Sequence, residues 1–141
     1  MGKEFTSPDE FREVMDRCFG MMSEDPDMGP KLRDADVPQR FEFDDLDAVV
    51  NIRAARDGEE GCLHWEWTDD VDWEPKVRMT MSSETANKYF QGKENVAVAI
   101  ARRRIKSGGD VRAALSLIPI TKPIYPRYRA LVERDYPHLA V

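Results

Sequence analysis

The sequence predicts an α+β domain in which about five helices cover one face of a mostly antiparallel sheet of about five strands. Three observations support this prediction. Residues 40–81 contain short segments in which apolar and polar residues alternate, which is the period of a half-buried strand. An apolar stripe of helical period precedes them, and helical patterns with capping residues follow them. With 141 residues, 41% of them hydrophobic, the chain has the size and composition of a single globular domain, 1–141.

An N-terminal helix is expected over residues 8–22. Ser7 is a suitable N-cap, Pro8 takes the first helical position, and Glu10 completes a capping box. The apolar positions that follow repeat at helical spacing and form one wide stripe: Phe11, Val14, Met15, Cys18, Phe19 and Met22. We expect most of this stripe to pack on the sheet, although its methionines and phenylalanines also suit an adaptable lipid pocket. A short helical turn is expected near residues 29–33.

The sheet is expected over residues 40–81, as a meander of antiparallel strands with a hairpin loop at residues 57–61. Alternation places a set of apolar residues on one face, which helices must cover: Val50, Ile52, Leu63, Trp65, Trp67, Val77, Met79 and Met81. The opposite face carries polar residues and is expected to see water: Asn51, Arg53, His64, Glu66, Arg78 and Thr80.

Crossover helices are expected over residues 83–101, followed by a last strand at 103–107. A connection of this length is typical of parallel strands, or of strands that are not neighbours. Asp110 occupies the N-cap position of a C-terminal helix over 110–120. A final helix is expected over 126–135, and Pro137 ends it.

Two motifs in this region carry a family resemblance. The first is Phe90-Gln91-Gly92-Lys93-Glu94-Asn95, which breaks the crossover helices, and the second is Ile105-Lys106-Ser107-Gly108-Gly109-Asp110, which is followed by Ala113-Ala114-Leu115. With Met81-Ser82 before them, these elements resemble the sterol carrier protein type 2 (SCP2) domain family over about a third of the chain. The family usually has Gly-Lys where this chain has Arg103-Arg104, so a glycine is missing at the start of the expected last strand.

The resemblance implies an SCP2-like α+β domain with a hydrophobic tunnel between sheet and helices. The tunnel would take a sterol, a fatty acid or a fatty acyl-CoA, and the resemblance implies no catalytic residues and no cofactor. We expect the ligand to contact apolar residues of the sheet and of the helices that cover it: Trp65, Trp67, Met79, Met81, Phe90, Ile100, Leu115, Leu117 and Ile118.

Charge and composition narrow the classes of partner. The formal net charge of −6 argues against a general nucleic-acid-binding protein. The run Arg102-Arg103-Arg104 could meet a phosphate, a lipid head group in a transient membrane-surface contact, or solvent alone. No apolar run approaches the roughly 18 residues of a transmembrane helix. Two cysteines far apart suit a reducing cytoplasm, and a monomer or a homodimer is expected.

The strand that carries Cys62, His64 and Glu66 has side chains of the kinds that bind a metal ion or take part in catalysis. Side chains two residues apart on a strand are about 6.6 Å apart, so three of them do not converge tetrahedrally on a metal ion. The same distance argues against a nucleophile–base pair. Two alternatives to a lipid carrier remain open. One is a small cone-shaped α+β enzyme acting on a steroid-like or acyl substrate, and the other is an interaction module with a filled core.

Overall fold

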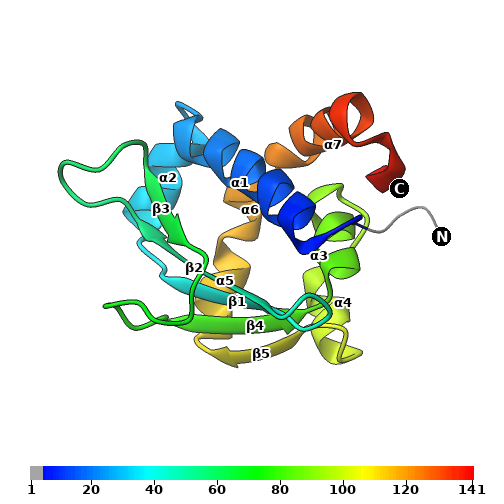
Figure 1. Ribbon diagram of the computed structural model, residues 1–141. Coiled ribbons are helices and arrows are strands. Elements are labelled where there is room, and N and C mark those ends of the chain that lie inside the picture. The colour runs from blue at the N-terminus through cyan, green and yellow to red at the C-terminus, as the bar shows by residue number, and fades with distance from the viewer. Residues whose placement is uncertain (1–4) are drawn as a thin grey trace.

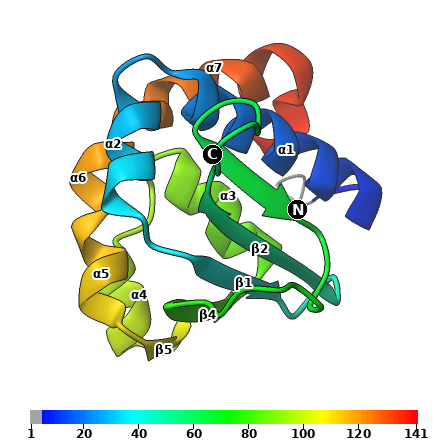
Figure 2. The same cartoon turned by 90° about the vertical axis from the view of Figure 1, so that its left-hand side faces the viewer.

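The computed structural model describes residues 5–141 and shows an α+β fold. The described strands are β1 (Gln39–Phe43), β2 (Ala48–Ala54), β3 (Leu63–Glu66), β4 (Val77–Met81) and β5 (Lys106–Gly109). The described helices are α1 (Pro8–Glu24), α2 (Met28–Ala35), α3 (Ser83–Phe90), α4 (Val96–Ala101), α5 (Val111–Ser116), α6 (Ile118–Thr121), α7 (Ile124–Asp135) and the 3-10 helix η1 (Pro137–Leu139). Figures 1 and 2 show the helices gathered on one side of the sheet, so the predicted two-layer architecture is confirmed.

The strand order is β3-β2-β1-β4-β5, and it corrects the predicted meander. The first three strands do form antiparallel neighbours, but β4 pairs in parallel with β1 instead of continuing beside β3. The long connection from β3 to β4 therefore carries the chain to the other side of β1, whose free edge offers unpaired backbone groups. The helices expected over 83–101 are present as α3 and α4, but the expected crossover was wrong, because they join β4 to its antiparallel neighbour β5.

The apolar stripe of α1 packs on the sheet as predicted. Its six members are all buried: Phe11, Val14, Met15, Cys18, Phe19 and Met22. The helix begins as the sequence indicates, with the Ser7 hydroxyl accepting from the Glu10 N–H at 3.1 Å and with Pro8 in its first turn. Phe19 meets Trp65 edge to face with ring centroids 5.6 Å apart, which ties this helix to the edge strand β3.

The last strand begins at Lys106 and not at residue 103, because the chain is still turning at the arginine run. The N–H groups of Arg104 and Ile105 both donate back to the carbonyl of Ala99, at 2.9 and 3.2 Å. Arg103 adopts a left-handed backbone conformation with φ of 63°, at the position where the family usually has glycine. Gly109 is the last residue of β5 and has φ of 75°, and a Cβ there would lie 2.5 Å from the Lys76 carbonyl oxygen.

The helices around the last strand also differ in detail from the prediction. Asp110 is the N-cap of α5 as predicted, and its carboxylate accepts from the Ala113 N–H at 3.1 Å. The expected single helix over 110–120 is divided at Leu117 into α5 and α6. The final helix starts at Ile124, earlier than expected, and the turn expected near residue 29 extends into α2.

The outer face of the sheet is only partly exposed, which corrects the expectation for two of its residues. Asn51 is fully buried and Arg53 is 7% exposed. The connection from β3 to β4 covers them: Asn51 donates to the Thr68 carbonyl at 2.7 Å, and the Arg53 guanidinium lies 4.8 Å from the centre of the Trp73 ring. The alternation of polar residues could not reveal this cover, because it comes from a loop with no regular pattern.

Candidate functional site: an apolar cavity

A cavity of about 110 Å³ lies between the inner face of the sheet and the helices. One water molecule needs roughly 10–15 Å³ of such volume, so the space is several times larger than a site for a single buried water. Its wall is largely apolar, with contributions from α1 and α2, from four of the strands and from the helices after β4. Major members are Phe19, Met22, Leu32, Phe41, Phe43, Ile52, Met79, Met81, Phe90, Ile105, Leu117 and Ile118.

The parallel pairing of β1 with β4 forms the floor of the cavity. The register places Phe41 beside Met79 and Phe43 beside Met81, so these four side chains share the inner face. The two phenylalanine rings stack with centroids 6.4 Å apart. Methionine side chains are flexible and polarisable, and they adapt to ligands of different shape. The floor is therefore apolar and able to rearrange.

Five of the residues expected to contact a ligand line this cavity, and four do not. The five are Met79, Met81, Phe90, Leu117 and Ile118. The four outside the wall are Trp65, Trp67, Ile100 and Leu115. Both tryptophans lie on the covered face, but their indole N–H groups donate to one carboxylate oxygen of Asp16 on α1, at 2.9 and 2.7 Å.

Solved structures of other proteins share this arrangement of sheet and helices. The UbiJ-SCP2 ubiquinone synthesis protein superimposes with a TM-score of 0.61 over 83% of this chain and 96% of its own, at 8% sequence identity. The sterol carrier protein domain 2 of Helicoverpa armigera gives a TM-score of 0.54 over 87% of this chain and 95% of its own, at 16% identity. Apo sterol carrier protein 2 from Yarrowia lipolytica gives 0.54 over 89% and 98%, at 12% identity. The fold is that of a sterol carrier protein 2 domain.

The same SCP2-like fold occurs within a larger chain. The stereoselective inverting sec-alkylsulfatase Pisa1 from Pseudomonas sp. superimposes with a TM-score of 0.60 over 85% of this chain, at 19% identity. This chain spans only 17% of the length of that enzyme. No protein-family model matches the sequence, and no curated protein sequence is significantly similar to it. The resemblance to these structures is therefore one of fold.

Several wall residues of this SCP2-like domain were not among the expected ligand contacts. Phe41 and Ile52 could have been found, because they have the same strand parity as the residues that were chosen. Phe19 and Met22 lie on the stripe of α1, which suits a pocket as well as a core. The polar members of the wall gave no periodic signal in the sequence: Gln39, Arg53, Tyr89 and Thr121.

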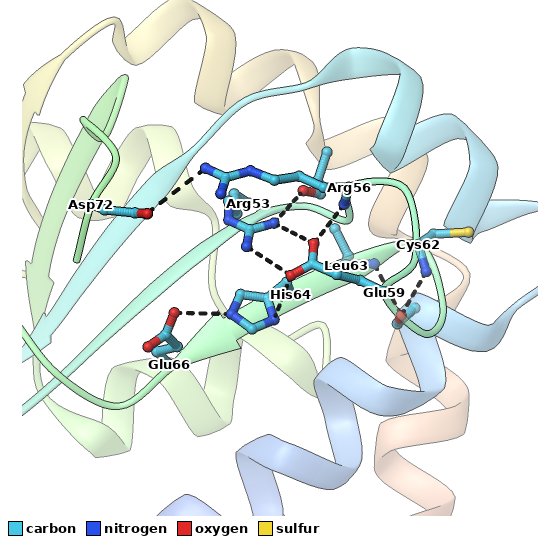
Figure 3. A network of polar contacts seen from close by, with 10 residues as sticks. Arg53, Arg56, Glu59, Cys62, Leu63, His64, Glu66 and Asp72 are labelled. Atoms are coloured by element: carbon cyan, nitrogen blue, oxygen red, sulfur yellow. Dashed lines mark hydrogen bonds and ion pairs between the residues drawn. The ribbon is translucent and has the colours of Figure 1, made fainter.

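A charged network lies at the β2–β3 hairpin, around the outer face of the sheet (Figure 3). Arg53 donates to both carboxylate oxygens of Glu59, at 2.7 and 2.8 Å. These bonds, together with a bond from the Arg56 N–H, lower the pKa of Glu59 to about 2. His64 lies between two carboxylates, 2.9 Å from an oxygen of Glu66 and 3.5 Å from one of Glu59. The network fastens the hairpin loop to β2.

The described residues also bear on metal binding and on insertion into a membrane. Within residues 5–141, no three His, Cys, Asp or Glu side chains are grouped so that they could hold a metal ion. The backbone N–H of Cys62 donates to the Ser23 hydroxyl at 2.9 Å. Over the same residues, no helix has the length and apolar character needed to cross a bilayer.

Proposed function

We propose that this SCP2-like domain binds an apolar lipid in the cavity and carries it without chemically changing it. The observation that carries the proposal is the cavity between sheet and helices, whose wall is largely apolar. Each Å² of apolar ligand surface removed from water contributes about 25 cal/mol, so a lipid needs no charged anchor to bind there. The size of the cavity disfavours the alternative of an interaction module with a filled core.

The composition of the wall favours a carrier over an enzyme. A cone-shaped enzyme of the kind considered above needs a carboxylate or a histidine at the pocket floor. Among the described residues, no Asp, Glu, His or Cys lines the cavity. Arg53 contributes to the wall, but its guanidinium lies on the outer face of the sheet, where both terminal nitrogens donate to Glu59. The wall thus offers apolar area and a few neutral polar groups.

The ligand classes in this proposal are a sterol, a fatty acid and a fatty acyl-CoA. The names of the neighbours from Helicoverpa armigera and Yarrowia lipolytica support the sterol. The proposal also includes a cytoplasmic location, which suits the free thiols of Cys18 and Cys62. It includes a monomer or a homodimer as the working state, and a transient contact with membrane surfaces during exchange of lipid.

Native mass spectrometry of the purified protein tests the proposal directly. We expect mass adducts that disappear when the protein is denatured and that return when the delipidated protein is incubated with lipid. A second measurement uses Nile red, whose fluorescence reports an apolar site, and follows its displacement by lipids of several classes. If there is no adduct, and if no alkane, alcohol, fatty acid or sterol displaces the dye, the proposed function is wrong.

A further inference from the structure

Two hydroxyl groups break the apolar wall of the cavity at one place. Tyr89 on α3 and Thr121 on α6 both line it, and their oxygen atoms lie 3.3 Å apart. The remaining polar members of the wall are different in kind: Gln39 begins β1, and Arg53 belongs to the charged network around the outer face. The pair of Tyr89 and Thr121 is therefore a localised polar spot in a cavity suited to an apolar body.

The protons of this pair are already committed to protein acceptors. The Thr121 hydroxyl donates to the carbonyl oxygen of Ile118 at 3.2 Å. Either hydroxyl could donate the bond between them, and the Thr121 bond to Ile118 favours Tyr89 as that donor. With Tyr89 as donor to Thr121, the pair has no proton left to give. Each hydroxyl oxygen has two lone pairs, so the pair keeps acceptor capacity even though Tyr89 also interacts with the Tyr125 hydroxyl. A group that fits this spot must be a donor.

The charges around the cavity also favour a neutral donor over an ionised carboxylate. An ionised carboxylate is an acceptor without a proton, and burying it without a donor or a cation is strongly unfavourable. Arg53 is the only cationic residue among the described wall residues, and its side chain lies on the outer face of the sheet, where Glu59 pairs with it through two short hydrogen bonds. A neutral hydroxyl group carries the proton that Tyr89 and Thr121 lack, and its desolvation is offset by that one hydrogen bond.

We infer that Tyr89 and Thr121 form a subsite for the hydroxyl group of a neutral lipid, which enters the cavity head first and donates a hydrogen bond to one of their oxygens. This inference rests on the proposed function. It selects among the classes named above: a lipid alcohol binds with its head group at the subsite, whereas a fatty acid or an acyl-CoA must leave its anionic head group outside.

Three ligands of equal chain length separate the chemistries: decanol, decyl methyl ether and decanoate. The ether keeps the oxygen of the alcohol and lacks its proton, and at about pH 8 the acid is ionised. Nile red displacement from the delipidated full-length protein gives the three affinities. We expect decanol to bind more tightly than the ether by roughly two- to tenfold, the usual range for one net hydrogen bond, and more tightly than decanoate.

Two variants remove the acceptors with little change of shape, Tyr89→Phe and Thr121→Val. Tyr89→Phe should weaken binding of decanol and leave the ether unchanged. Thr121→Val frees the Tyr89 proton, so it should improve binding of the ether relative to decanol, and the double variant should bind the two ligands equally. Gln39→Leu is the matched control, because it removes the other neutral polar side chain of the wall. In that variant the preference for decanol should persist. The ratio of the affinities for decanol and the ether is measured within each variant, so a general loss of stability does not change it.

The outcomes separate this inference from the proposed function. If none of the three ligands displaces the dye from the wild type, the proposed function fails and the inference fails with it. If all three bind and decanol has no advantage, the proposed function stands and the subsite is refuted. The subsite is also refuted if the variants weaken alcohol and ether equally, or if Gln39→Leu is the change that abolishes the preference.

Discussion

Filling the cavity from one side is the sharpest test of whether the space seen in the structure exists in solution. Leu117 is suited to this test because it is 6% exposed, lines the cavity and lies at the junction of α5 and α6. Leu117→Trp directs a large indole into the region that a lipid would occupy. In a filled core, added bulk of this kind forces side chains off their preferred rotamers and costs about 1–3 kcal/mol.

The magnitude follows from the space available. A cavity of about 110 Å³ can take up a substantial part of the indole, so much of the overpacking strain is avoided. We therefore expect the free energy of unfolding to fall by less than about 1 kcal/mol, below the usual cost of overpacking. Lipid affinity should fall at least about tenfold, which corresponds to about 1.4 kcal/mol.

Leu131→Trp is the matched control for this change. Leu131 on α7 is 3% exposed and does not line the cavity, so the same substitution there overpacks an ordinary core. Urea unfolding and Nile red titration of both variants should give opposite patterns, with binding lost in the first and stability lost in the second. If Leu117→Trp is as destabilised as Leu131→Trp and still binds lipid at wild-type affinity, the reasoning from the cavity is refuted.

Three further predictions test individual features. Arg103→Gly should raise the free energy of unfolding, measured with urea, by up to about 1 kcal/mol, because glycine relieves the left-handed backbone at φ 63°. Arg102 has φ of −93°, so Arg102→Gly should lower the free energy of unfolding by about 0.5–1 kcal/mol. Equal effects of the two substitutions would contradict this explanation. Asp110→Ala should lower the melting temperature, with a loss of about 1 kcal/mol for the N-cap, and an unchanged melting curve would mean that the cap contributes nothing. The bonds from Arg53 hold the pKa of Glu59 at about 2, below the ordinary value of 4.5, so their contribution to stability is present above about pH 4.5 and is lost as the pH falls toward 2. The stability difference between wild type and Glu59→Gln, followed by urea unfolding against pH, should shrink over that interval, and a constant difference would exclude this origin.

Local patterns were enough to predict most of the elements and the faces on which their apolar residues are buried. The stripe of α1 is buried because its apolar positions repeat at helical spacing. Asp110 was predicted as an N-cap from its place before an apolar helical pattern, and its carboxylate does accept from the first turn. Met79 and Met81 face inward because strand alternation leaves a single choice of face. Each of these features depends on residues that are close together in the sequence.

The order of the strands depended on interactions that no local pattern contains. Nothing in the sequence of β4 distinguishes a place beside β3 from a place beside β1. The observed order is accompanied by contacts from the connection between them, in which Trp73 covers Arg53 and the Thr68 carbonyl accepts from Asn51. Both contacts join residues on a strand to a loop with no periodicity. The same contacts explain why two outward-facing polar residues are buried.

Local sequence patterns also could not predict whether the core contains a cavity, because the wall is assembled from segments far apart in the sequence. An apolar strand face and an apolar helix stripe are equally compatible with a filled core and with a cavity. The difference arises where α5 and α6 meet at Leu117 and where the parallel pairing sets Met79 and Met81 beside the phenylalanines of β1. The polar spot on the wall is even harder to predict from sequence patterns, because Tyr89 and Thr121 are 32 residues apart and lie on different helices. Apolar area alone would let this cavity accept many lipids, so any preference for one head group must come from such isolated polar residues. Which of these hydroxyls donates and which accepts can be judged only from the three-dimensional positions of both.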